Sequence, residues 1–90
     1  MEFEWDRDKA AANLRKHGIS FEEASSVFGD PLAISFQDPE HSIGEHRLLA
    51  FGVSRTGALL VVSFAHRGKR TRLISARRAT RAERKIYEEG

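Results

Sequence analysis

The feature that most restricts the fold of this chain is a series of three apolar segments separated by very short polar connections. Residues 46–54, 58–65 and 71–77 are rich in β-branched and aromatic side chains, which favour strands. The connections "RTG" and "HRGKR" both contain glycine, which is typical of tight turns between antiparallel neighbours. The second half of the chain therefore predicts an antiparallel meander.

Two further strands and three helices are expected around this meander. The strands are "EFEWD" at 2–6 and "LAISF" at 32–36. The helices are expected at 8–17, 20–28 and 81–89, and the last two begin with the S/T-x-x-E spacing of a capping box. The prediction is one α+β domain, residues 1–90, in the order β-α-α-β-β-β-β-α with a small antiparallel sheet of four to five strands.

The first helix has two distinct stripes of side chains. An i, i+4, i+7 course predicts that Ala10, Leu14 and His17 form the core face. The same spacing one step round the helix gives a polar stripe of Lys9, Asn13 and Lys16.

Charge is divided unevenly between the two halves of the sequence. Residues 1–45 carry 10 acidic and 4 basic side chains, whereas residues 46–90 carry 3 acidic and 11 basic ones. Such a division indicates a polyanionic ligand for the second half. The alternative is that the two halves neutralise each other in the folded domain.

Much of the positive charge lies where the last strand leads into the last helix. Alternation along 71–77 predicts that Leu73, Ser75 and Arg77 share one face of the strand, opposite Ile74 and its neighbours. Arg78 and Arg81 follow, and Arg77 could border a groove with Arg84 and Tyr87. The alternative is a solvated helix with pairs such as Arg84–Glu88.

A histidine at the end of the first helix is the second candidate for chemistry. His17 follows Lys16 at a helix C-terminus, where the helix dipole favours a cation, and histidine is the usual acid–base residue near neutral pH. The alternative is a histidine that only caps carbonyl groups. No metal-ligand spacing is present: "DPEH" (His41) with His46 is the nearest approach, so we expect neither a metal nor a cofactor.

The absence of cysteine fits a reducing cytoplasm. The acidic N-terminal stretch does not resemble a signal peptide, and the longest apolar run is too short to cross a bilayer. We therefore expect a cytoplasmic protein with no membrane partner.

An arginine-rich surface with one histidine or tyrosine suits metal-free RNA cleavage. The 2′-hydroxyl attacks the adjacent phosphorus, a base removes its proton, and an acid assists the departure of the 5′-oxygen. Cations stabilise the charge that develops on the phosphoryl oxygens. Arginine suits that task because its planar donors hold two oxygens and it stays protonated.

Two long spaced motifs give the sequence a resemblance to a known family. The first is F-x-W-D-x-x-K-x-x-x-N-x-x-K-H-G, carried by Phe3, Trp5, Asp6, Lys9, Asn13, Lys16, His17 and Gly18. The second is R-x-I-S-A-R-x-A-x-x-x-E-R-x-x-Y-E, carried by Arg72, Ile74, Ser75, Ala76, Arg77, Ala79, Glu83, Arg84, Tyr87 and Glu88. The chain resembles the BrnT family of bacterial toxins from about residue 2 to residue 89.

The resemblance implies a RelE-like ribonuclease toxin that arrests translation by cleaving RNA. It also implies a cognate antitoxin that neutralises the toxin by direct binding, in a 2:2 assembly through antitoxin dimerisation. Operator DNA would be bound only indirectly, through the antitoxin. The alternatives are a non-catalytic module that binds nucleic acid or acts as an antitoxin-binding co-repressor, and an inactivated toxin kept for regulation.

Charge placement and resemblance together predict a basic concave sheet face bounded by the first and last helices. The expected catalytic residues are His17, Arg77, Arg84 and Tyr87. The arginines would hold phosphate, and His17 or Tyr87 would act as base or acid. Further contacts to RNA phosphate are expected from Lys9, Lys16, Arg47, Arg72 and Arg78.

Overall fold

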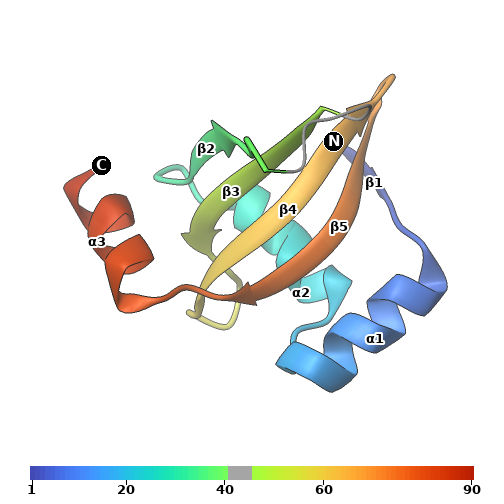
Figure 1. Ribbon diagram of the computed structural model, residues 1–90, viewed down its shortest axis with the longest axis horizontal. Coiled ribbons are helices and arrows are strands. Elements are labelled where there is room, and N and C mark those ends of the chain that lie inside the picture. Colours follow the sequence, from blue (N-terminus) through green and yellow to red (C-terminus); the bar gives the residue numbers. More distant parts are fainter. Residues whose placement is uncertain (41–45) are drawn as a thin grey trace.

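A computed structural model describes residues 1–40 and 46–90 of the chain (Figure 1). The α+β class and the predicted order of elements are confirmed. The described elements are β1 (Glu2–Glu4), α1 (Arg7–His17), α2 (Phe21–Ser25), the 3₁₀ helix η1 (Ser26–Gly29), β2 (Ile34–Gln37), β3 (Arg47–Val53), β4 (Leu59–Arg67), β5 (Arg70–Arg78) and α3 (Arg81–Glu89).

The five strands form one sheet in the order β1-β5-β4-β3-β2. Strands β2 to β5 pair antiparallel, as the short connections predict. The edge strand β1 instead runs parallel to β5, with Phe3 opposite Thr71, so the sheet is mixed. Alternation of side chains does not reveal this, because it reports which face is buried and not the direction of the neighbouring strand.

The core lies between the sheet and the helical segment α2–η1, which runs behind the sheet in Figure 1. Phe21 and Val27 from this segment are almost fully buried with Leu60 and Val62 of β4. The segment approaches β3 so closely that a Cβ on Gly52 would lie 2.7 Å from the Val27 Cγ1 atom. Glycine at this position therefore sets the distance between η1 and the sheet.

The prediction for the two stripes of α1 is wrong for Leu14 and Asn13, whereas Ala10 packs against the core as expected. Leu14, expected in the core, is 52% exposed, whereas Asn13 of the expected polar stripe is only 7% exposed. The Asn13 Nδ2 group donates to the carbonyls of Ala76 (2.8 Å) and Ile19 (3.0 Å). Its Oδ1 atom accepts from the Ala76 N–H at 3.0 Å. Strand β1 pairs β5 only as far as Arg72, so the Asn13 carboxamide pairs with the β5 edge beyond that point.

A bulge in β5 changes the predicted faces of that strand. Ser63 lies opposite Ser75, but the next residue, Phe64, lies opposite Leu73. Ile74 is therefore an extra residue, and the alternation shifts by one. As a result Leu73 and Ala76 both belong to the core cluster, contrary to the prediction that groups Leu73 with Ser75.

Helix α3 lies beyond the end of β5, beside β3 in Figure 1. It begins with the predicted capping box, in which Thr80 Oγ1 accepts from the Glu83 N–H and Glu83 Oε1 accepts from the Thr80 N–H. The Tyr87 hydroxyl donates to Asp30 Oδ2 at 2.6 Å. No α3 residue is buried, so α3 is held mainly by its ends. None of the helices in the described part of the chain has the length and apolar character needed to cross a membrane.

Candidate functional site

Two neighbouring grooves meet at the β5 bulge. The sheet groove has a volume of about 570 Å³ and is lined by Asp38, Pro39, Glu40, Arg47, Leu49, Ser63, Ile74, Ser75 and Arg77. The helix groove has a volume of about 240 Å³ and is lined by Lys9, Ala12, Asn13, Lys16, His17, Ile74 and Ser75. Ile74 and Ser75 line both grooves, so the bulge forms the wall between them.

The helix groove carries positive charge without an acid in its lining. Its Lys9, Lys16 and His17 come from α1, where Lys16 lies about two turns after Lys9 and His17 follows it directly. Asp6 fixes the start of this helix by accepting from the Asp8 and Lys9 N–H groups. The carboxamide of Asn13 holds the middle of the helix against β5. The hydrogen bonds of Asp6 and Asn13 therefore hold α1 so that its two lysines and His17 line the same groove as Ser75.

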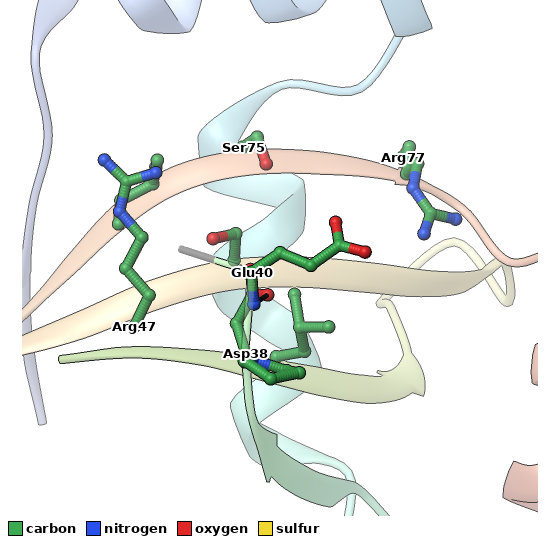
Figure 2. A pocket seen from close by; sticks show the side chains of 9 residues that line it. Asp38, Glu40, Arg47, Ser75 and Arg77 are labelled. Carbon is green, nitrogen blue, oxygen red and sulfur yellow. Dashed lines mark hydrogen bonds between the residues drawn. The ribbon is translucent and has the colours of Figure 1, made fainter. Parts of the chain in front are cut away.

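The sheet groove combines opposite charges with an apolar base. Figure 2 shows Arg47 and Arg77 at its two ends and Glu40 extended over it, with Asp38 below. Arg47 comes from β3 and Arg77 from β5. Leu49 adds the apolar part of the lining together with Ile74 of the bulge.

Arg77 does not face the groove as an isolated cation. Its Nη1 and Nη2 groups donate to Glu83 Oε1 at 2.7 Å and Glu83 Oε2 at 2.8 Å. These hydrogen bonds lower the pKa of Glu83 to about 2 and raise the pKa of Arg77. Nη1 also donates to the Arg78 carbonyl. Three of the five N–H donors of Arg77 thus have partners within residues 1–40 and 46–90, and its charge is shared.

The structure brings five of the nine predicted site residues to these grooves, namely Lys9, Lys16, His17, Arg47 and Arg77. The others line neither groove. Arg72 forms an ion pair with Glu4 of β1 at 2.9 Å, and Arg78 and Arg84 are exposed at and beyond the end of β5. The bond to Asp30 occupies the Tyr87 hydroxyl and raises its pKa, which makes it a weaker acid.

Four polar groups of the grooves were not singled out from the sequence: Asp38, Glu40, Ser63 and Ser75. Ser75 lies in the second motif, but alternation alone placed it beside Leu73. Asp38 and Glu40 follow β2 in a polar connection that has no periodic pattern. Only the pairing of β2 with β3 carries them to the groove.

No group of three or more His, Cys, Asp or Glu side chains that could hold a metal ion is found among residues 1–40 and 46–90. His41, considered with His46 as a ligand, lies outside the described residues. The expectation of a metal-free site therefore stays a prediction.

Comparisons with known proteins point to one family. A family model described as "Ribonuclease toxin, BrnT, of type II toxin-antitoxin system" matches residues 5–83. Among solved structures, the chain is similar to the ribonuclease toxin BrnT of Brucella abortus, with 26% sequence identity and a TM-score of 0.71. The similarity covers 90% of this chain and 99% of that chain. No curated protein matches the chain.

Proposed function

The chain belongs to the BrnT family of ribonuclease toxins of type II toxin–antitoxin systems, and from this premise we propose that it is a metal-independent endoribonuclease that arrests translation. The observation that carries the proposal is the juxtaposition of His17, two lysines and Ser75 in one acid-free groove. The reaction takes place in the cytoplasm, where the RNA substrate is found.

The proposed chemistry needs only protein side chains. The 2′-hydroxyl oxygen attacks the adjacent phosphorus, a 2′,3′-cyclic phosphate forms, and the 5′-oxygen leaves with a proton. His17 transfers a proton in this reaction because it is the titratable acid–base side chain of the helix groove. Lys9 and Lys16 lie in the same groove and stabilise the negative charge that builds on the phosphoryl oxygens.

The arginines of the sheet groove act on the same RNA strand from the other side of the bulge. Arg47 and Arg77 bind the strand beyond the scissile phosphate, and Arg77 does so with its guanidinium oriented by Glu83. We assign Tyr87 to the attachment of α3, because its hydroxyl is bonded to Asp30. Arg72, Arg78 and Arg84 supply charge at the periphery.

The proposal is tested by incubating the purified protein, freed of any partner, with total RNA in the presence and absence of EDTA. We expect fragments that persist in EDTA and that disappear in His17→Ala protein with an intact fold. Cleavage that EDTA abolishes would contradict the metal-independent mechanism. A second arm adds translating ribosomes and tests whether cleavage depends on them. An absence of cuts in both arms would reject ribonuclease activity.

A non-catalytic binding module is the second candidate. It is favoured by the partners of Arg77 and Tyr87, since two of the four expected catalytic residues already have their functional atoms engaged. Such a module would bind RNA with a strong salt dependence and leave the strand intact. Gel analysis of the RNA recovered from the bound complex separates the two candidates.

We further propose that a cognate antitoxin neutralises the chain by binding it directly, in a 2:2 assembly built on an antitoxin dimer. Helix α3 exposes Arg81, Arg84 and Lys85, which form no ion pair within the described residues. An acidic antitoxin segment is complementary to this surface. Light scattering of the co-purified pair measures the stoichiometry, and charge reversal at Arg84 and Lys85 is expected to weaken the complex.

A further inference from the structure

The two grooves differ in the kind of ligand that their charges favour. The helix groove has two lysines, a histidine and no acid in its lining, which suits a phosphate group. The sheet groove contains Asp38 and Glu40 as well as two arginines, and Glu83 already neutralises Arg77. Between the two arginines at its ends, phosphate gains less than in the helix groove, because the carboxylates repel it. An uncharged polar group is the better occupant.

The lining of the sheet groove fits a flat heterocycle. Leu49 and Ile74 form its apolar part, and the Ser63 and Ser75 hydroxyls lie opposite each other on paired strands. A volume of about 570 Å³ lies within the usual range of ligand pockets, roughly 300–1,000 Å³. Proteins that read single-stranded RNA commonly place an unstacked base in such a pocket and bond its Watson–Crick edge.

Glu40 supplies a carboxylate at a defined position of this groove. Its backbone N–H donates to Asp38 Oδ1 at 3.2 Å, and the Asp38 N–H donates to the Arg47 carbonyl at 2.9 Å. Residues 38–40, which follow β2, are thereby tied to β3. Figure 2 shows the Glu40 side chain extended over the groove, and an ionised carboxylate is a hydrogen-bond acceptor at both oxygens.

We propose that the sheet groove is a nucleobase pocket that prefers guanine through the Glu40 carboxylate. Guanine presents two adjacent donors, N1–H and the 2-amino group, which match the two oxygens of a carboxylate. Adenine and cytosine present one amino donor beside an acceptor, and uracil presents one imino donor between two acceptors. This inference rests on the proposed function only in taking RNA as the ligand.

The shared wall connects base recognition to the proposed site of cleavage. Ile74 and Ser75 line both grooves, so a nucleotide whose base occupies the sheet groove has its phosphate beside the helix groove. Cleavage therefore occurs next to the bound guanine.

The test uses three short single-stranded RNAs that differ only at one central nucleotide, which is guanosine, inosine or adenosine. 2′-Deoxy sugars at that position and at the preceding one prevent cleavage on either side of the base, so that fluorescence anisotropy measures binding alone. We expect about tenfold tighter binding of the guanine oligonucleotide than of the adenine one. Inosine lacks the 2-amino group and is expected to lie between them.

Glu40→Gln is the decisive variant, and Glu22→Gln is its control. Removal of any acid strengthens binding to a polyanion, so the relevant quantity is the guanine-to-adenine affinity ratio. The ratio is expected to fall to about 1 in Glu40→Gln, because an amide offers a donor where guanine needs an acceptor. Glu22 is exposed on α2 and lines neither groove, so Glu22→Gln is expected to keep the ratio.

Two results would overturn the proposal: equal affinity of the wild type for the three oligonucleotides, or an unchanged ratio in Glu40→Gln. Its failure is distinguishable from that of the proposed function. A protein that cuts RNA but binds the three oligonucleotides equally is a ribonuclease without this base pocket. A protein that prefers guanine but cuts no RNA has the pocket without the ribonuclease activity.

Discussion

A single carboxylate, Glu83, has two tasks in this structure. It closes the capping box of α3 with Thr80, and it holds both terminal nitrogens of Arg77. The start of α3 and the orientation of a groove arginine are therefore fixed by the same group. Such a bond to a charged group is stronger than one between neutral groups, but water screens it because the Arg77 side chain is 40% exposed.

This pair makes stability depend on pH in a defined direction. The pKa of Glu83 is lowered from 4.5 to about 2, so the contribution of its carboxylate is fully present above about pH 4.5 and is lost as the pH falls towards 2. We expect Glu83→Gln to cost roughly 1–2 kcal/mol at pH 7. Urea unfolding of both proteins should show this difference shrinking between pH 4.5 and pH 2. A difference that is constant over that range would contradict the assignment.

The role of His17 is tested by its removal from the helix groove. If His17 transfers a proton during cleavage, His17→Ala should lower the single-turnover cleavage rate about 10²- to 10⁴-fold. Leu14→Ala is the matched control on the same helix, because Leu14 is exposed and lines neither groove. Equal rates for the two variants would remove His17 from the chemistry.

At the scale of elements, α1 is attached to the sheet by a polar contact rather than by an apolar stripe. Asn13 satisfies both backbone groups of Ala76 and the Ile19 carbonyl. These hydrogen bonds replace strand pairing along the part of β5 that β1 does not reach. They also position α1, and with it His17, relative to Ser75 of β5.

Loss of the Asn13 hydrogen bonds is expected to lower the free energy of unfolding substantially. Asn13→Ala leaves buried backbone groups of β5 without partners, which costs about 2–3 kcal/mol of the free energy of unfolding. Leu14→Ala, one residue along, should change it by less than about 0.5 kcal/mol. Denaturant unfolding measures both values. If Leu14→Ala lowered the free energy of unfolding more than Asn13→Ala does, the apolar face predicted from the periodicity would hold α1 to the sheet.

Helix α3 gives a second prediction at this scale. Tyr87→Phe removes the hydroxyl that bonds Asp30 and should lower the melting temperature. Because Tyr87 lines neither groove, the cleavage rate at a temperature well below melting should stay close to that of the wild type. A loss of rate as large as that of His17→Ala would instead make Tyr87 catalytic.

At the scale of the whole molecule, the structure shows how much of the uneven charge of the sequence is neutralised inside the fold. Part of it is neutralised internally, as Glu4 pairs with Arg72 and Glu83 pairs with Arg77. The lysines of the helix groove, however, have no ion pair within residues 1–40 and 46–90. The surface proposed to bind a polyanion is therefore smaller than the net charge of the second half of the chain indicates.

Salt dependence measures the size of that surface. If the lysines and arginines of the two grooves meet phosphate, log Kd should vary with log salt concentration with a slope of about 2–3 for single-stranded RNA. The double variant Lys9→Gln/Lys16→Gln should reduce this slope by about 1.4. Arg15→Gln is the control, because Arg15 is exposed on α1 and lines neither groove. Equal slopes for all three proteins would exclude the helix groove as the phosphate site.

The sequence by itself determined the features that depend on neighbours along the chain. Strands β3 to β5 and the Thr80–Glu83 capping box follow from side-chain periodicity and short-range hydrogen bonding, which act within a few residues. The motif around His17 also contains Lys9, Lys16 and His17, which line one side of the proposed site. These interactions are local, so their signals survive in the linear sequence.

Only the tertiary structure decided which polar groups meet. Asn13 looks like a surface residue until β5 presents an unpaired edge to it, 63 residues away. The bulge at Ile74 shifts the faces of β5 because β4 has one residue fewer there. Glu40 reaches the groove because β2 pairs with β3. Each of these contacts depends on the position of a distant backbone, and no periodicity along the chain encodes that position.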